Sequence, residues 1–293
     1  MRSSLPATIG TSDPLPAALT RRPAGRGFRP AWVGRLVIGS LVPALVLIAW
    51  WIASASGFID PHLLPAPGRV VAAARDAFFG SPQLTLPGVV PYQGAGWVHL
   101  GASLRRCLVA FVLAAIIGIA VGFAVGLSRR VASLLDPTLN GLRSVPLYAW
   151  LPIMLVWFGI GETAARALIF LGALWPILLA TAGAVGRVPR QYLETARMLG
   201  TPRRRLWRRV YLPASLPEIV TGLRLGLTWA WMSVTVAELT GATSGLGAMM
   251  NAARETSRTD QILVGMFTFA VVGFAADALL RTVTAPLTRW SRT

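Results

Sequence analysis

The sequence predicts an all-helical membrane protein with six membrane-spanning helices. Of its 293 residues, 54% are hydrophobic and only 13% are charged, whereas soluble domains carry about 25% charged residues. Mean hydropathy is +0.60. Several apolar stretches have roughly the 20 residues that a helix needs to cross a bilayer. Arginines collect in alternate connecting segments, as they do in the cytoplasmic loops of membrane proteins.

Composition also excludes several classes of function. All 28 basic residues are arginines, against 11 acidic residues, so the net charge is +17. Without lysine, the chain has neither the phosphate-binding lysine of a P-loop ATPase nor a Schiff-base lysine. One cysteine, Cys107, and two separated histidines, His62 and His99, leave no metal site. We therefore expect a protein that is not an enzyme, with no catalytic residue and no cofactor on this chain.

The six predicted spans differ in how clearly they are apolar. Four contain no charged residue: Leu36–Ile59, Cys107–Ser128, Ser144–Gly161 and Ala167–Gly186. The other two are Ile219–Ala237, with Arg224, and Gln261–Leu280, with Asp277. An ion at the bilayer centre costs roughly 2.5–3.5 kcal/mol but far less near an interface, and both charges lie toward an end of their segment.

The distribution of arginine predicts the orientation of the chain. Twenty arginines fall in 1–35, 129–143, 187–217 and 281–293, and seven fall in 60–106, 162–166 and 241–260. Because cytoplasmic loops are enriched in arginine, the first set is assigned to the cytoplasm. Both termini are then cytoplasmic.

The domain organisation follows from these spans. The proline- and arginine-rich residues 1–35 are expected to be a disordered cytoplasmic tail. The segment 36–59 is interpreted as a retained transmembrane anchor, because its apolar run exceeds the 7–15 residues of a signal peptide. Residues 60–106 are expected outside the membrane, with an amphipathic helix over 67–79 that begins at Pro67, followed by a Gly- and Pro-rich loop over 80–96. Residues 107–285 form a five-helix core, and 286–293 a cytoplasmic C-terminal tail.

Small residues and prolines mark particular places in the core. Gly118, Gly122 and Gly126 recur every four residues and predict a stripe for close helix packing. Pro146, Pro152 and Pro176 are expected to kink or bound the third and fourth spans.

The fifth span carries the candidate residues of a translocation pathway. Arg224, Trp229, Ser233 and Glu238 give it a mixed polar and aromatic character that is unusual for a lipid-facing helix. Two simpler interpretations stay open. Arg224 can extend to the cytoplasmic interface, and Glu238 can sit at headgroup level or pair with Arg254.

The third cytoplasmic loop is predicted to be a helix–turn–helix. Its first helix is expected to stop at Gly200, and Thr201-Pro202 to open a second helix that ends at Leu212-Pro213. Ser215 and Glu218 have the spacing of a capping box that begins the fifth span. Most of the loop arginines are interpreted as contacts for lipid headgroups, and nucleic-acid binding is disfavoured because the loop joins two membrane spans. Apolar residues exposed on such a short helix need a partner groove.

At this loop the sequence resembles the membrane-spanning permease subunits of bacterial ABC importers. Their shared pattern is E-A-A-x3-G-x9-I-x-L-P, and Thr195 and Val210 here replace an alanine and the isoleucine. The matching residues are Glu194, Ala196, Gly200, Leu212 and Pro213, with the nine-residue gap intact. In that family the loop forms a coupling helix that docks in a separate ATPase subunit.

Other segments resemble the nitrate, taurine and aliphatic-sulfonate branch of these permeases. They are 64–67, 103–106, 134–137, 143–146, 151–152, 157–161 and 244–247. The segment 80–96 and the N-terminal tail are longer than is usual in that branch. Sulfonate, taurine, nitrate, bicarbonate and a pyrimidine vitamin precursor stay open as substrates.

The resemblance implies a type I importer permease in the bacterial inner membrane, without catalytic activity of its own. Its implied partners are a dimer of ABC ATPase subunits that holds ATP-Mg, an extracytoplasmic solute-binding protein and a second copy of the permease. The main alternative is an ion-coupled secondary transporter. That class is expected to carry ionisable residues at mid-membrane, which the four clearest spans lack.

Overall fold

The computed structural model describes residues 31–80 and 94–287, and every regular element in that part of the chain is helical. Residues 1–52 and 53–293 form two separate units. The first unit contributes most of α1 (Ala31–Ala55), whose apolar side chains, such as Leu45 and Trp51, are exposed. Its described apolar part, Leu41–Ala55, is shorter than a full span, so the first anchor stays a prediction.

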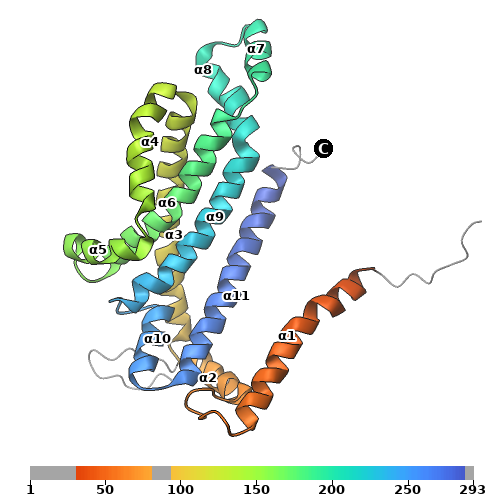
Figure 1. The fold of residues 1–293 in the computed structure, drawn as a ribbon, viewed down its shortest axis with the longest axis vertical. Helices are drawn as coiled ribbons and strands as arrows, with labels where there is room; N and C mark the ends of the chain where they lie inside the picture. The colour runs from red at the N-terminus through yellow and green to blue at the C-terminus, as the bar shows by residue number, and fades with distance from the viewer. Residues whose placement is uncertain (1–30, 81–93, 288–293) are drawn as a thin grey trace, which may run out of the picture. The chain divides into compact units, whose positions relative to one another are not determined.

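The second unit is built around three long helices, α3, α6 and α9, of which α6 packs against both others (Figure 1). In chain order its elements are α2 (Pro67–Phe79), α3 (Gly96–Leu127), α4 (Arg129–Ser144), η2 (Leu147–Trp150), α5 (Leu151–Phe158), α6 (Glu162–Gly186), α7 (Arg190–Met198), α8 (Arg203–Leu206), the π-helical turn η3 (Trp207–Tyr211), α9 (Leu212–Leu239), α10 (Leu246–Glu255) and α11 (Thr259–Thr284).

Four helical stretches among the described residues are long and apolar enough to cross a membrane. They are Gly96–Leu127, Glu162–Gly186, Arg204–Leu239 and Thr259–Leu287. A fifth candidate is the bent pair Arg129–Ser144 and Leu147–Phe158. The predicted all-helical membrane class is therefore confirmed, whereas the count of six spans is not reached in the part of the chain described.

The predicted third span, Ser144–Gly161, holds a helical stretch only over Leu147–Phe158, which is shorter than a full span. Helix α4 ends at Ser144, and the next helical pair departs from it by 92°. A residue before proline is disfavoured in helical conformation, and Val145 and Pro146 are both extended, with ψ of 120° and 141°. Pro146 thus bounds the helix, and the preceding segment 129–143, expected as a loop, is helical.

Helix α3 begins eleven residues before the predicted start at Cys107. The predicted span excludes Arg105 and Arg106, because a lone ion inside a membrane is costly. The helix continues through Arg106 because acidic residues on other helices neutralise this arginine.

The predicted glycine stripe of α3 lies directly against α6. A Cβ added to Gly122 would approach the Thr181 Cβ to 2.7 Å, and one added to Gly126 would approach the Val185 Cβ to 2.7 Å. Gly118 faces Ile177 at 3.1 Å in the same way. Only residues without side chains allow these two helix backbones to come so close.

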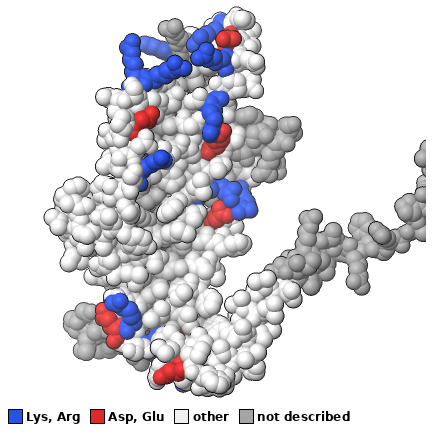
Figure 2. Space-filling view, viewed as in Figure 1, with Lys and Arg blue, Asp and Glu red and all other residues white. Residues whose placement is uncertain are grey.

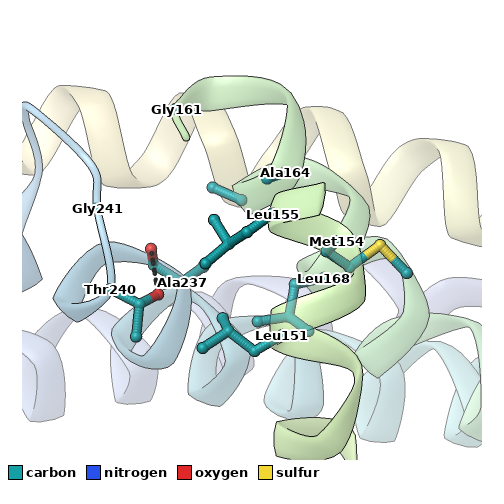
Figure 3. A pocket seen from close by; sticks show the side chains of 10 residues that line it. Leu151, Met154, Leu155, Gly161, Ala164, Leu168, Ala237, Thr240 and Gly241 are labelled. Carbon is teal, nitrogen blue, oxygen red and sulfur yellow. Dashed lines mark hydrogen bonds between the residues drawn. The ribbon is translucent and has the colours of Figure 1, made fainter. Parts of the chain in front are cut away.

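Helix α5 is short and apolar and packs on α6. Figure 3 shows Leu151 and Met154 of α5 beside Leu168 of α6 and Ala237 of α9. The space that they leave is only about 10 Å³, no more than one water molecule occupies. This contact is therefore part of the packed core and leaves no room for a solute.

The two ends of the second unit are built from short elements. Helices α7 and α8 form one end, and α2 and α10 lie at the other (Figure 1). The predicted amphipathic helix is confirmed as α2 with Pro67 at its first position, and it buries Val70, Ala73 and Ala77. Val71, which follows Val70 in the sequence, is exposed. Helix α10 was not predicted, and most of the 80–96 loop lies outside the described residues.

Candidate functional site

The loop between α6 and α9 begins with the predicted short helix, α7. The helix ends at Met198, and Gly200 adopts a positive φ of 72°, a conformation that glycine takes without strain. The Thr201 amide donates to the Ala196 carbonyl at 2.9 Å and the Gly200 amide to the Arg197 carbonyl, which closes the helix end. The motif glycine therefore sets where the chain turns back.

The second half of the loop differs from the prediction. Arg204–Leu239 is one continuous helical stretch, so Leu212-Pro213 does not end a helix. The π-helical turn Trp207–Tyr211 precedes Pro213, and such a turn changes the hydrogen-bond register just where proline has no N–H to donate. The predicted capping box is also wrong. Ser215 donates to the Tyr211 carbonyl at 2.7 Å inside the helix, and Glu218 pairs with Arg187.

The loop exposes apolar side chains at its tip. Met198 and Leu199 are 86% and 80% exposed, and Tyr192 and Trp207 are about half exposed. The motif residues Glu194 and Thr195 are exposed beside them, whereas Ala196, Val210 and Leu212 are partly covered. Exposed apolar side chains grouped on a short element are typical of a binding surface.

Arginines surround this tip. Figure 2 shows positive charge gathered over the α7–α8 end, whereas most of the rest of the visible face is uncharged. Arg204, Arg205, Arg208 and Arg209 are all exposed, and the guanidinium of Arg208 lies 5.5 Å from the ring centroid of Trp207. This end of the unit therefore combines a positive surface with an apolar tip.

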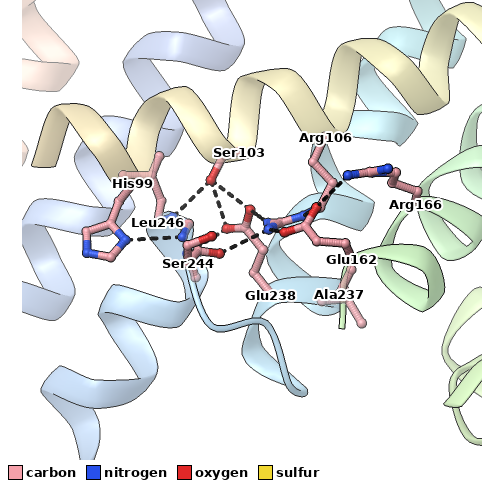
Figure 4. Close-up of polar contacts among 12 residues, drawn as sticks. His99, Ser103, Arg106, Glu162, Arg166, Ala237, Glu238, Ser244 and Leu246 are labelled. Carbon is pink, nitrogen blue, oxygen red and sulfur yellow. Dashed lines mark hydrogen bonds and ion pairs between the residues drawn. The ribbon is translucent and has the colours of Figure 1, made fainter. Parts of the chain in front are cut away.

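A buried ionic network lies near the other end of the long helices (Figure 4). Arg106 of α3 is paired with Glu238 of α9 and with Glu162 at the start of α6. Arg106 and Glu238 are each 1% exposed, whereas the Glu162 side chain is 46% exposed. The arginine thus joins three long helices through charged hydrogen bonds, which are the strong ones.

Neutral donors complete the network. The Ser103 hydroxyl donates to the Glu238 carboxylate at 2.7 Å and accepts from the Leu246 amide at 2.9 Å. The Gly247 amide also donates to Glu238, at 2.8 Å, and the Gly245 amide donates to Nδ1 of His99 at 3.1 Å. A Cβ on Gly245 would lie 2.3 Å from Glu238 Oε1, so the positive φ and the close approach both require glycine there. The network therefore fixes the turn that leads into α10.

The sequence did not predict this network as a unit, although Ser103, Arg106 and 244–247 lie in family-like segments and Glu238 was a candidate pathway residue. The proposed pairing of Glu238 with Arg254 is wrong, because Arg106 is its partner. One usable signal was the spacing of His99, Ser103 and Arg106, which places all three on one side of a helix. Nothing in the local sequence shows that their partners come from α9.

The other predicted pathway residues lie at separate places on α9. Arg224 donates from Nε to Asp277 of α11 at 3.2 Å, and both side chains are about one third exposed. Ser233 is buried and donates to the Trp229 carbonyl at 2.7 Å. Trp229 is 50% exposed and faces a cavity beside the break between α4 and α5. Of these residues, Trp229 borders a cavity large enough for a small solute.

Among residues 31–80 and 94–287, no three His, Cys, Asp or Glu side chains are grouped closely enough to hold a metal ion. Cys107 is buried and unpaired by any disulfide.

Comparison with known proteins identifies the family. The family described as "Binding-protein-dependent transport system inner membrane component" matches residues 114–288, more than half of the chain. The taurine transport system permease protein TauC of Escherichia coli (strain K12) is 39% identical over 87% of this chain and 89% of its own length. The nitrate import permease protein NrtB of Synechococcus elongatus is 31% identical over 89% and 95%.

A bicarbonate transport system permease protein, CmpB of Synechococcus elongatus, is 35% identical over 83% of this chain and 85% of its own. Among solved structures, an inward-facing MetNI methionine ABC transporter chain aligns with a TM-score of 0.52 at 22% identity. It covers 64% of this chain and 95% of that one, and at this identity it supports the fold alone. The helical core, the loop pattern and these relatives agree. The chain belongs to the family of binding-protein-dependent transport system inner membrane components, and it is similar to the ABC permeases named for taurine, nitrate and bicarbonate.

Proposed function

We propose that this chain is the permease subunit of an ATP-driven importer, and that two copies form the pathway for a small solute. Taurine, an aliphatic sulfonate, nitrate and bicarbonate are the substrate candidates, because relatives at 31–39% identity are named for these solutes. ATP-Mg is bound and hydrolysed on a separate ATPase subunit. The chain itself contributes no catalytic group.

The loop from α7 to the start of α9 is the proposed point of coupling. Its exposed apolar tip, Met198 and Leu199, is the observation that carries this assignment, because such side chains gain free energy when a partner groove covers them. Glu194 and Gly200 of the family-like motif lie in the same short segment. Movement of the ATPase subunits then shifts the permease between outward-open and inward-open states.

The proposed orientation places the α7–α8 end and both termini in the cytoplasm. Its support is the arginine excess of that end, since cytoplasmic segments are enriched in arginine. The α2–α10 end then faces outward, where a solute-binding protein docks.

The experiment that tests this function is uptake into vesicles containing the permease with its ATPase and binding protein. Glu194→Arg reverses a charge at the coupling surface, and Gly200→Pro forbids the positive φ at the turn, so each should abolish ATP-dependent uptake without reducing membrane insertion. Thr195→Ala restores the family's usual residue and serves as the matched control with normal uptake. Normal uptake by both altered proteins would refute the coupling assignment.

A further inference from the structure

A second feature of the structure is a cavity beside the break between α4 and α5. It has a volume of about 360 Å³ and is bordered by three tryptophans, Trp150, Trp175 and Trp229, and by Arg143. Pockets for small organic ligands start at roughly 300 Å³ and combine aromatic walls with a few polar groups. The size and lining of this cavity are therefore those of a small-molecule site.

The cavity lies beside the middle of α6 and at the C-terminal end of α4. Trp175 is thirteen residues from the first residue of α6 and eleven from its last, about 20 Å and about 16 Å along the axis. Arg143 lies about 21 Å along α4 from Arg129, beside the chain break at Val145 and Pro146. Non-helical backbone within a membrane is tolerated where it lines a cavity rather than facing lipid.

Two polar groups at this cavity have no partner in the described part of the chain. Arg143 is exposed and forms no ion pair with any described residue, so its guanidinium is available to bind an acceptor. The indole N–H of Trp150 is buried and donates to no described residue. A buried donor without an acceptor is rare, and the buried Trp150 N–H and the exposed Arg143 guanidinium can both donate to a ligand.

The remaining chemistry of the cavity selects the class of ligand. None of its lining residues is acidic, so nothing repels an anion or balances the Arg143 charge from within. The tryptophan rings offer an apolar surface that a bare inorganic ion such as nitrate cannot use. An organic anion with a short apolar body matches both parts, because its head can accept from Arg143 and Trp150 while its body covers the rings.

We propose that this cavity binds a small organic anion of the sulfonate type during transport, with Arg143 and the Trp150 N–H at its head and Trp175 and Trp229 around its body. This inference rests on the proposed import function and narrows its substrate class to oxyanions that carry an apolar stem.

The test uses the full permease–ATPase complex in nanodiscs of phosphatidylcholine, which contain no anionic lipid to compete. Butane-1-sulfonate is the probe, and isothermal titration calorimetry measures its Kd. We expect butane-1-sulfonate to bind and n-butylammonium not to displace it. Nitrate should displace it with an affinity at least tenfold weaker than that of the sulfonate. Equal displacement by nitrate, or no binding of the sulfonate at millimolar concentration, would overturn the proposal.

Variants assign the binding to this cavity. Arg143→Gln should weaken the affinity for butane-1-sulfonate about tenfold or more, the value of one hydrogen bond to a charged group. Trp150→Phe keeps the ring and removes only the N–H, so it should weaken binding severalfold without disturbing the fold. Arg130→Gln and Trp157→Phe, which lie on α4 and α5 outside the cavity lining, are the matched controls with unchanged Kd. Unchanged Kd in both cavity variants would place the sulfonate elsewhere.

The coupling variant separates this inference from the proposed function. A complex with Glu194→Arg should lose uptake yet bind butane-1-sulfonate with normal Kd, because its cavity is intact. Normal uptake by that variant would count against the coupling assignment, whereas unchanged binding in the cavity variants counts against the cavity alone.

Discussion

The guanidinium of Arg106 in α3 is paired with the carboxylate of Glu238 in α9, and each side chain is only 1% exposed. Ser103 and the Gly247 amide satisfy further oxygen positions of the same carboxylate. Removing one partner of a buried, fully hydrogen-bonded ion pair strongly destabilises the folded protein, because the other charge is then left buried and uncompensated. This relationship between two distant residues fixes how α3 and α9 meet.

Arg106→Gln should therefore lower the free energy of unfolding by about 3–5 kcal/mol, the cost of leaving a charge buried and unpaired. The measurement is thermal denaturation of the purified permease, followed by size-exclusion chromatography after heating. Arg166→Gln is the matched control, because Arg166 also pairs with Glu162 but is 39% exposed. Loss of the exposed Arg166–Glu162 ion pair should lower the free energy of unfolding by no more than about 1 kcal/mol. Equal destabilisation by the two variants would show that the network is not buried as described.

Gly122→Val should destabilise the contact between α3 and α6. Even the first carbon of a side chain would approach the Leu178 carbonyl oxygen to 2.8 Å, so the helices must move apart. We expect a loss of about 1–3 kcal/mol, typical of overpacking, in the same thermal assay. Gly101→Ala is the control on the same helix, because its Cβ meets nothing within 4 Å and alanine favours helix by about 1 kcal/mol. A neutral Gly122→Val variant would contradict the close packing.

Leu199→Glu should prevent the ATPase subunit from co-purifying with the permease. Leu199 is 80% exposed, so a charge there leaves the permease's own stability within about 0.5 kcal/mol but is costly inside a partner groove. The measurement is the ratio of ATPase to permease after affinity purification. Leu199→Met keeps the apolar surface and should co-purify normally. Retention of the ATPase by the glutamate variant would mean that this tip is not the docking surface.

Arg224→Gln separates a structural from a pathway role for Arg224. Asp277 keeps a hydrogen bond from Arg281 at 2.7 Å, and the Arg224–Asp277 pair is partly exposed, so stability should change by less than about 1 kcal/mol. If Arg224 lines the pathway as the sequence predicts, uptake should nevertheless fall severalfold at equal protein amounts. Arg281→Gln is the control that removes the other partner of Asp277. Equal uptake in the two variants would assign Arg224 to packing alone.

Local sequence was sufficient for features that depend on a few neighbouring residues. The apolar stretches identify helices because the cost of placing a segment in a membrane depends on its own composition. The amphipathic helix at Pro67 and the positive φ of Gly200 follow from proline and glycine stereochemistry. The family-like spacing around Glu194 and Gly200 located the exposed loop before its geometry was known.

Errors arose where the state of a residue depends on distant partners. The segment 129–143 was expected to be a connecting loop because it is charged, yet it is helical and forms a bent pair with the short apolar helix over Leu147–Phe158. The serine and glutamate at 215 and 218 have the spacing of a cap, yet they lie inside a continuous helix because Glu218 pairs with Arg187 and Ser215 bonds to Tyr211. A serine followed three residues later by a glutamate can stand at the start of a helix or inside one. This spacing alone therefore does not distinguish the two.

The sequence by itself determined that this is a helical membrane protein, where the loop with the family-like motif lies, and that the glycine face of α3 can pack closely. The tertiary structure alone decided that Arg106 belongs inside a helix, because its partner Glu238 is 132 residues away. It also decided that three tryptophans and Arg143 border one cavity. Solvation of a segment is a local property, whereas compensation of a charge or formation of a cavity requires side chains that only folding brings together.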